Sequence, residues 1–305
     1  MEGSPAAWCC LRGVRRATLG GRLPHSPNSM LHRSPPLGRL LGLLALVPLC
    51  ACASSPDVAA PEPEVMSALV EAAAPNEDAT TGAAPLRLPA VLRIGTSIEG
   101  RPLTYSLFEG PHAGPRRETV LILATIHGNE NAGTALTEML ATRLVAEPTL
   151  LAGRRVVLMP VVNPDGLAAD ARGNANRVDL NRNFDSANWG ARTGGQEPLS
   201  EPESRAVLEL LERYQPDRVV SFHQPVSVID YDGPAADYAA AVGEAGGLPV
   251  QRIGSRPGSL GSYVGLDLGL PILTVELPRG SEDLPDAELW ERYGALALEC
   301  VRFGG

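Results

Sequence analysis

An apolar run that ends on a histidine is the feature of this sequence that most restricts the fold. Residues Thr119–Ile126 are apolar or β-prone and predict a buried strand, after which Gly128 and Asn129 predict a sharp turn. His127 and Glu130 would then lie beyond the carboxyl end of the strand, where α/β sheets bind ligands. One histidine and one carboxylate are two-thirds of a His2Glu zinc site, although such a pair is common by chance.

Strand-like and helical patterns alternate along the rest of the chain. Strands that alternate with helices favour a three-layer α/β/α domain with a mostly parallel, mixed central sheet. The predicted strands are 91–94, 103–109, 119–126, 155–162, 218–223 and 271–277. The predicted helices are 132–146, 201–214, 236–246 and 286–302.

Other apolar runs also carry or precede polar residues. Asn163-Pro-Asp-Gly166 closes one run, and the run that begins at Val219 ends on His223. Glu276 stands inside the apolar run Pro271–Pro278, where a carboxylate costs free energy unless it is paired or functional. The alternative for Glu276 is a side chain that faces solvent from an edge strand.

Residues 91–305 contain only three histidines. His127 and His223 each end a strand-like run, whereas His112 lies in a Gly/Pro-rich loop and is expected at the surface. A hydrogen-bonded rim or core histidine is the alternative to metal ligation for the first two. If they bind a metal, a carbonyl or carboxylate should hold the second nitrogen of each ring.

The polar segment Arg172–Phe184 completes a set of five ordered motifs. Together these motifs resemble the zinc carboxypeptidase family, the funnelin-type metallopeptidases. The resemblance implies that family's fold and one Zn²⁺ ion bound by His127, Glu130 and His223. It also implies that Glu276 is the general base, which takes a proton from zinc-bound water and passes it to the leaving amine.

The same resemblance implies substrate contacts in the polar segment. Asn181 and Arg182 match the pair that grips the terminal carboxylate of the substrate, which suits the fork of a guanidinium group. Arg172 matches the arginine that polarises the scissile carbonyl, with a solvated loop arginine as the alternative. Arg177 departs from the family, whose members usually have glycine there. No tyrosine occupies the expected substrate-covering position in 257–262.

Residues 221–234 and 256–262 look most like the murein peptide amidase branch of the family. That branch cuts the γ-D-glutamyl–meso-diaminopimelate bond of cell-wall peptides, and Arg182 would then bind the α-carboxylate of diaminopimelate. The distal ammonium group would need an acid, for which Asp230 and Asp232 are candidates. As an alternative, both aspartates are turn residues.

Three other functions remain open at this point. The first is a zinc carboxypeptidase that acts on ordinary peptide C-termini. The second is a non-catalytic cell-wall-binding lipoprotein, against which the presence of Glu276 and all three ligands argues. The third is an acylase of the aspartoacylase kind, against which Asn163-Pro-Asp-Gly166 and Thr274-Val-Glu-Leu-Pro278 argue.

Residues 1–52 are expected to be a presegment with a lipoprotein-type signal peptide. Basic residues precede the apolar run Leu40–Val47, which is too short to span a membrane. Leu49-Cys-Ala-Cys52 resembles a bacterial lipobox with the lipid on Cys52, and an ordinary secretory signal is the alternative. A start of translation at Met30 would give a signal of normal length.

The composition beyond the signal restricts location and partners. Residues 53–90 are rich in Ala and Pro and predict a disordered tether before the domain 91–305. Without residues 1–51, the chain has 20 arginines against 34 acidic residues, which makes nucleic acid an improbable partner. We expect a periplasmic, membrane-anchored protein of a bacterium, with a peptide or murein peptide as substrate.

Overall fold

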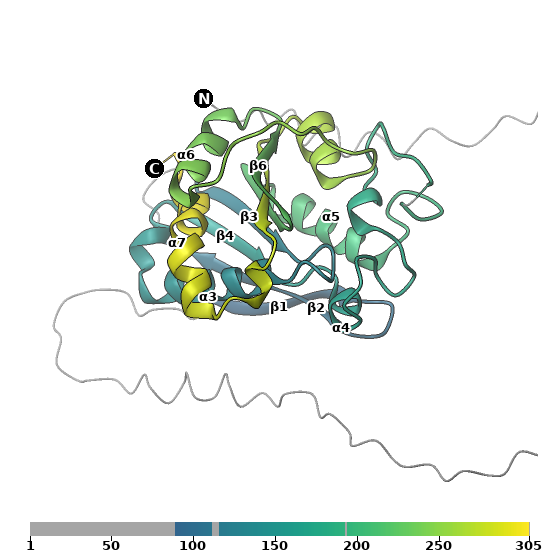
Figure 1. Cartoon of the computed structure of the whole chain (residues 1–305), viewed down its shortest axis with the longest axis horizontal. Helices are drawn as coiled ribbons and strands as arrows, with labels where there is room; N and C mark the ends of the chain where they lie inside the picture. Colours follow the sequence, from purple (N-terminus) through teal and green to yellow (C-terminus); the bar gives the residue numbers. More distant parts are fainter. Residues whose placement is uncertain (1–88, 112–115, 193, 305) are drawn as a thin grey trace, which may run out of the picture. The chain divides into compact units, whose positions relative to one another are not determined.

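The structure is a computed structural model that describes residues 89–111, 116–192 and 194–304 (Figure 1). The expected signal peptide, Cys52, His112 and all but the last two residues of the tether lie outside the described residues. The first strand begins at Ala90, one residue before the predicted start of the domain. Among the described helices, none has the length and apolar character that crossing a bilayer requires.

A seven-stranded mixed sheet forms the centre of the domain. Its strands are β1 (Ala90–Thr96), β2 (Pro102–Glu109), β3 (Glu118–Ala124), β4 (Arg154–Met159), β5 (Arg218–His223), β6 (Val226–Asp232) and β7 (Ile272–Pro278). They lie in the order β1-β2-β4-β3-β5-β7-β6. The four central strands β4, β3, β5 and β7 pair in parallel, while the pairings of β1, β2 and β6 are antiparallel. The predicted sheet is therefore confirmed.

Helices cover both faces of the sheet (Figure 1). The α-helices are α3 (Ala132–Ala146), α4 (Pro164–Ala168), α5 (Pro202–Tyr214), α6 (Ala236–Gly246) and α7 (Asp286–Arg302). Short helical turns are η2 (Pro148–Leu151), η3 (Leu180–Arg182), η4 (Ser262–Asp267) and η5 (Ser281–Asp283). Helices α3, α6 and α7 pack on one face and α5 packs on the other. This arrangement confirms the three-layer α/β/α architecture.

The alternation of side chains along β3 shows why its sequence is apolar throughout. Val120 and Ile122 belong to the core under α3, α6 and α7, whereas Leu121 and Leu123 belong to the core under α5. All four side chains are fully buried. A parallel strand with both faces covered needs apolar residues at every position. The residues that follow β3 are therefore held at the rim of a rigid layer.

Strand β6 was not among the predicted strands. Two aspartates, Asp230 and Asp232, interrupt its apolar pattern, and the turn interpretation of these residues is wrong. Both aspartates are buried, and in the pairing of β6 with β7 Asp230 lies opposite Thr274 and Asp232 lies opposite Ile272. Because β6 forms the edge of the sheet, β7 has a neighbouring strand on each side.

Candidate metal centre and active site

The loop after β3 carries the first two candidate ligands. Thr125 has a φ of 51°, so the backbone turns sharply after the strand ends. His127 follows, and the N–H of Glu130 donates to its carbonyl at 3.1 Å. Glu130 stands two residues before α3. The positions of His127 and Glu130 are therefore fixed by the end of β3 and the beginning of α3.

The Asn163-Pro-Asp-Gly166 motif packs against this loop and holds it by hydrogen bonds. The amide of Asn163 donates to the carbonyl of Ile126 at 3.3 Å, and its side-chain oxygen accepts the N–H of Gly166 at 2.8 Å. A Cβ at Gly128 would lie 2.0 Å from the carbonyl carbon of Gly166. Only glycine allows this approach. The motif therefore positions His127, and none of its residues belongs to the group of candidate metal ligands.

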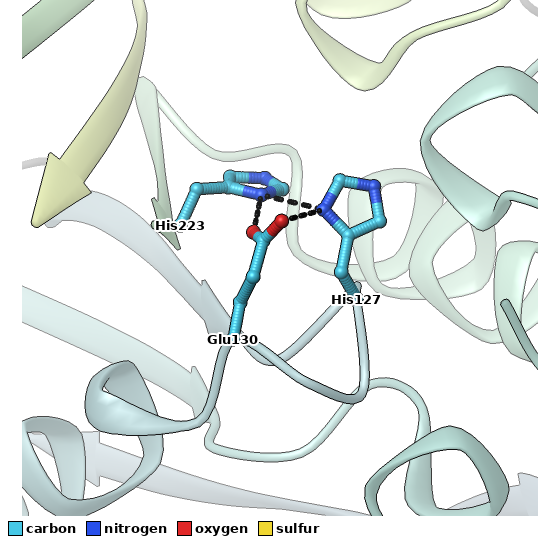
Figure 2. A group of neighbouring side chains, drawn as sticks. All are labelled: His127, Glu130 and His223. Atoms are coloured by element: carbon cyan, nitrogen blue, oxygen red, sulfur yellow. Dashed lines mark hydrogen bonds and ion pairs between the residues drawn. The ribbon is translucent and has the colours of Figure 1, made fainter. Parts of the chain in front are cut away.

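The three predicted ligands meet at one point although they come from distant segments (Figure 2). Nδ1 of His127 lies 2.9 Å from Oε1 of Glu130, and Nδ1 of His223 lies 2.9 Å from Oε2. The two Nδ1 atoms are 3.2 Å apart. All three side chains are buried, and their ligand atoms lie within 4.8 Å of one another. Two imidazole nitrogens and a carboxylate are the donor set of a catalytic zinc site with an open position.

Both imidazole rings are held by their second nitrogen. Nε2 of His127 lies 3.0 Å from Oδ1 of Asp179, as expected for a metal-ligating histidine. Nε2 of His223 lies 3.0 Å from the hydroxyl of Ser221. The prediction that a carbonyl or carboxylate holds the second nitrogen is therefore wrong for this ring. Side chains two apart on β5 share a face, which explains the short hydroxyl partner. Asp179 and Ser221 were not among the predicted site residues.

The charge of Glu130 is stabilised strongly. Burial alone would raise its pKa, but hydrogen bonds from His127 and His223 outweigh burial and hold the pKa well below its usual range. Nη1 of Arg172 donates to Oε1 of Glu130 at 3.0 Å, and the N–H of Gln224 donates to Oε2 at 3.2 Å. The carboxylate is therefore ionised, as a metal ligand must be.

Glu276 lies beside this centre on the neighbouring strand. It pairs in register with His223 across β5 and β7, which places the two side chains on the same face of the sheet. Because β6 covers the other side of β7, the edge-strand alternative is wrong. The carboxylate is half-buried, and Oε2 accepts the N–H of Val226 at 3.4 Å. Burial is the chief cause that raises the pKa of Glu276.

Arg172, Asn181 and Arg182 gather around Asp179. Nε of Arg172 donates to Oδ2 of Asp179 at 3.1 Å, and the guanidinium of Arg172 is about half exposed. The side-chain oxygen of Asn181 accepts the N–H of Leu260 at 2.9 Å. The guanidinium of Arg182 donates to the carbonyl of Asn181 and makes no ion pair with a carboxylate of the described residues. Arg172, predicted to be catalytic, and Asn181 and Arg182, predicted to bind the substrate, thus lie together next to the metal centre.

Asp230 holds a loop. Its Oδ1 accepts the N–H groups of Tyr231 and Ile253 at 2.9 and 2.8 Å. Burial is the chief cause that raises the pKa of Asp230. Asp232 accepts a hydrogen bond from the hydroxyl of Ser255. Both aspartates therefore fasten the segment 251–261 to β6, and this anchoring was not predicted.

Comparison with known proteins identifies the family. The zinc carboxypeptidase family matches residues 85–237. Murein peptide amidase A from Escherichia coli K12 is 38% identical over 236 residues, which cover 70% of this chain and 90% of that protein. The catalytic chain of human carboxypeptidase N is 32% identical over 178 residues, 46% of this chain and 39% of that protein.

A solved structure agrees with these relatives. The crystal structure of a murein-tripeptide amidase from Escherichia coli O157 matches with a TM-score of 0.58 and 31% identity, and covers 73% of this chain and 95% of that one. This chain belongs to the zinc carboxypeptidase family. It is accordingly a zinc metallohydrolase, and His127, Glu130 and His223 are the residues that can hold the ion. Within the family it falls in the murein peptide amidase branch.

Proposed function

We propose that this protein hydrolyses the γ-D-glutamyl–meso-diaminopimelate bond of murein peptides. The observation that carries the proposal is the register pair of Glu276 and His223, which sets a half-buried carboxylate beside a His2Glu donor set. The similarity to murein peptide amidases supports the choice of substrate. The reaction is the hydrolysis of an amide bond next to a free carboxylate.

Each polar group of the site has a role in this reaction. Zinc, when bound, acts as a Lewis acid that lowers the pKa of a water molecule. Glu276 accepts a proton from the attacking water and delivers it to the leaving nitrogen. Its half-buried position in register with His223 places this carboxylate beside the metal centre and partly removes it from bulk water.

The arginines of the site bind and polarise the substrate. Arg182 has no carboxylate partner among the described residues, so the guanidinium N–H groups that do not bond to the carbonyl of Asn181 can bind the α-carboxylate of diaminopimelate beside the bond to be cut. The amide nitrogen of Asn181 can add a hydrogen bond, because Leu260 uses only the amide oxygen. Arg172 reaches the carbonyl oxygen as negative charge develops there. Asp230 remains a candidate partner for the distal ammonium.

A peptide panel tests the proposed function. Zinc-loaded full-length protein would be incubated with L-Ala-γ-D-Glu-meso-diaminopimelate and with ordinary peptides, and the products followed by mass spectrometry. We expect release of diaminopimelate from the murein tripeptide and no cleavage of the ordinary peptides. A zinc-loaded protein that left the tripeptide intact would contradict the proposal.

The second candidate function is a carboxypeptidase that acts on ordinary peptide C-termini. The similarity to the catalytic chain of carboxypeptidase N favours it. The same zinc, base and carboxylate-binding groups would serve this reaction. Trimming of ordinary peptides from the C-terminus in the panel, with the murein tripeptide left intact, would select it.

We also propose that the protein is exported to the periplasm and held at a membrane by lipid on Cys52. The signal-like run and the lipobox-like sequence support this proposal. Labelled fatty acid should be incorporated into the wild-type protein and into a Cys50→Ser variant, but not into Cys52→Ser. Labelling that survived in Cys52→Ser would contradict the anchor.

A further inference from the structure

Arg256 is an exposed arginine that has no ionic partner in the part of the chain that the structure describes. Most other arginines of the domain make ion pairs; Arg155, for example, pairs with Glu109 and Arg218 with Glu118. Arg182 also makes no ion pair with a described carboxylate, so Arg256 is distinguished by its position rather than by the lack of a partner. Its position decides what it can bind.

The backbone around Arg256 is docked on the carboxylate-binding segment. The carbonyl of Gly258 accepts the N–H of Phe184 at 3.0 Å, and a Cβ at Gly258 would lie 2.2 Å from the carbonyl oxygen of Arg182. The N–H of Leu260 donates to Asn181 at 2.9 Å. Arg256 therefore starts a turn whose next residues touch both predicted carboxylate-binding residues.

The turn itself is rigid. The carbonyl of Arg256 accepts the N–H of Ser259 at 3.0 Å and the hydroxyl of Ser262 at 2.9 Å. Gly258 has a φ of 74°, a conformation that glycine adopts without strain. Asp230 and Asp232 fasten the preceding residues to β6. A fixed backbone limits the positions that the guanidinium of Arg256 can reach.

Positive charge accumulates where this turn meets the metal centre. Burial lowers the pKa of Arg182, and the cations Arg172 and Arg256 lower it further, while Asp179 acts in the opposite direction. Asp179 already accepts hydrogen bonds from His127 and Arg172. Neither Arg182 nor Arg256 forms an ion pair with a carboxylate of the described residues. The electrostatic effect of Arg256 on Arg182, together with the contact between Gly258 and the carbonyl of Arg182, indicates a positive region that attracts anionic groups of a substrate.

We propose that Arg256 binds a second carboxylate of the substrate, in addition to the one bound by Arg182. This inference rests on the proposed function. A γ-D-glutamyl–meso-diaminopimelate peptide offers two such groups, the α-carboxylate that the γ linkage leaves free on glutamate and the distal carboxylate of diaminopimelate. The shared chemistry is a carboxylate that accepts hydrogen bonds from a guanidinium group.

Amidated substrates separate the two sources. Zinc-loaded full-length protein would be assayed on the parent tripeptide, on the peptide with the glutamyl α-carboxylate amidated and on the peptide with the distal carboxylate amidated. Wild type, Arg256→Gln and Arg256→Lys would be compared with Arg252→Gln, a matched loss of charge on the same segment. Zinc content and thermal midpoint would be measured to verify that each variant is folded.

In the wild type, one of the two amidations should raise KM about tenfold and change kcat little, because a charge-assisted hydrogen bond that forms on binding is lost. Arg256→Gln should raise KM for the parent by a similar factor and should no longer distinguish the parent from that amidated peptide. Arg256→Lys should retain part of the preference, and Arg252→Gln should behave as wild type. The amidation that matters identifies the carboxylate.

Two results would overturn the inference while the proposed function stands. One is that the folded Arg256→Gln variant cleaves the parent peptide with the same KM as the wild type. The other is an Arg256→Gln variant that still distinguishes the parent from both amidated peptides as the wild type does. If the wild type cleaves none of the three peptides, the proposed function fails and this inference fails with it.

Discussion

Oδ1 of Asp179 lies 3.0 Å from Nε2 of His127, while Nδ1 of the same ring faces Glu130 and His223. The contact directs one nitrogen of the ring outward and leaves the other for the metal. A ligand whose second nitrogen is held in this way is oriented before the metal binds and is more basic.

Asp179→Asn should therefore weaken zinc binding. We expect a loss of affinity of about 10- to 100-fold, the range typical when such a partner of a ligating histidine is removed. Competition for zinc against a chelator of known affinity would measure the loss. Asp185→Asn, an exposed aspartate in the next turn, is the matched control and should retain full affinity. Equal affinity in both variants would show that Asp179 does not support the site.

Glu276→Gln should separate metal binding from catalysis. The variant should keep one zinc ion per chain, because Glu276 is not one of the converging ligands, while kcat falls by about 10²-fold or more. Steady-state kinetics and metal analysis would measure the two effects. Glu291→Gln, an exposed glutamate on α7, should retain full activity. Near-normal turnover in Glu276→Gln would remove this residue from the role of base.

Removal of zinc should abolish activity and lower the thermal midpoint. Zinc that binds only the folded chain adds about 2.7 kcal/mol of stability at a free concentration 100 times its Kd. Chelation followed by return of zinc should reverse both changes, as measured by activity and thermal unfolding. His223→Ala should show no activity and no rise in midpoint on addition of zinc. A rise equal to that of wild type would place the metal elsewhere.

Asp165 should make stability depend on pH in the acid range. Burial would raise its pKa, but hydrogen bonds from Ser97 at 2.7 Å, the N–H of Glu99 at 3.0 Å and Arg101 at 2.7 Å outweigh burial and lower it. A lowered pKa contributes stability that is present above the unfolded value of about 3.9 and is lost as the pH falls through the folded value.

Asp165→Asn should accordingly reduce the unfolding free energy by about 1–3 kcal/mol at pH 7, with a smaller difference below about pH 4. Urea unfolding of the zinc-free proteins across this range would test the trend. Asp185→Asn should show no comparable change. A difference that stayed constant down to the lowest pH would contradict the role of the ionised carboxylate.

Arg177 adopts a φ of 59° in the loop between Arg172 and Asp179. This left-handed conformation costs a side-chain-bearing residue about 1–2 kcal/mol, which explains why glycine suits the position. Because glycine also gains entropy in the unfolded chain, Arg177→Gly should stabilise the fold by at most about 1 kcal/mol. Thermal unfolding would measure this gain. Arg177→Ala keeps the strain and should give no gain, so equal stabilisation by both variants would point to charge instead.

The sequence was sufficient for the framework of the domain. Helices 132–146, 236–246 and 286–302 have the predicted bounds, because apolar periodicity and flanking polar or proline residues marked their ends. The central strands were evident because burial on both faces requires an apolar residue at nearly every position. The convergence of His127 and His223 was implied by the resemblance to the zinc carboxypeptidase family, and it agrees with the rule that ligands bind at the carboxyl ends of parallel strands.

Contacts between distant segments could not be derived in this way. Asp179 lies 52 residues from His127, and nothing local distinguishes it from other loop aspartates. Strand β6 was hidden because Asp230 and Asp232 are buried against the segment 251–261, which supplies their hydrogen bonds only in the folded state. Ser221 holds His223 through a hydroxyl that has no distinctive signal in sequence.

The contact between Gly258 and the carbonyl of Arg182 has a consequence for how specificity can evolve. Because a Cβ would come within 2.2 Å of that oxygen, a side chain at position 258 would push the turn away from Asn181 and Arg182. Replacements at Arg256 leave the contact untouched. We therefore expect that substitutions at position 256 can change substrate preference without moving Asn181 and Arg182, the residues proposed to bind the terminal carboxylate.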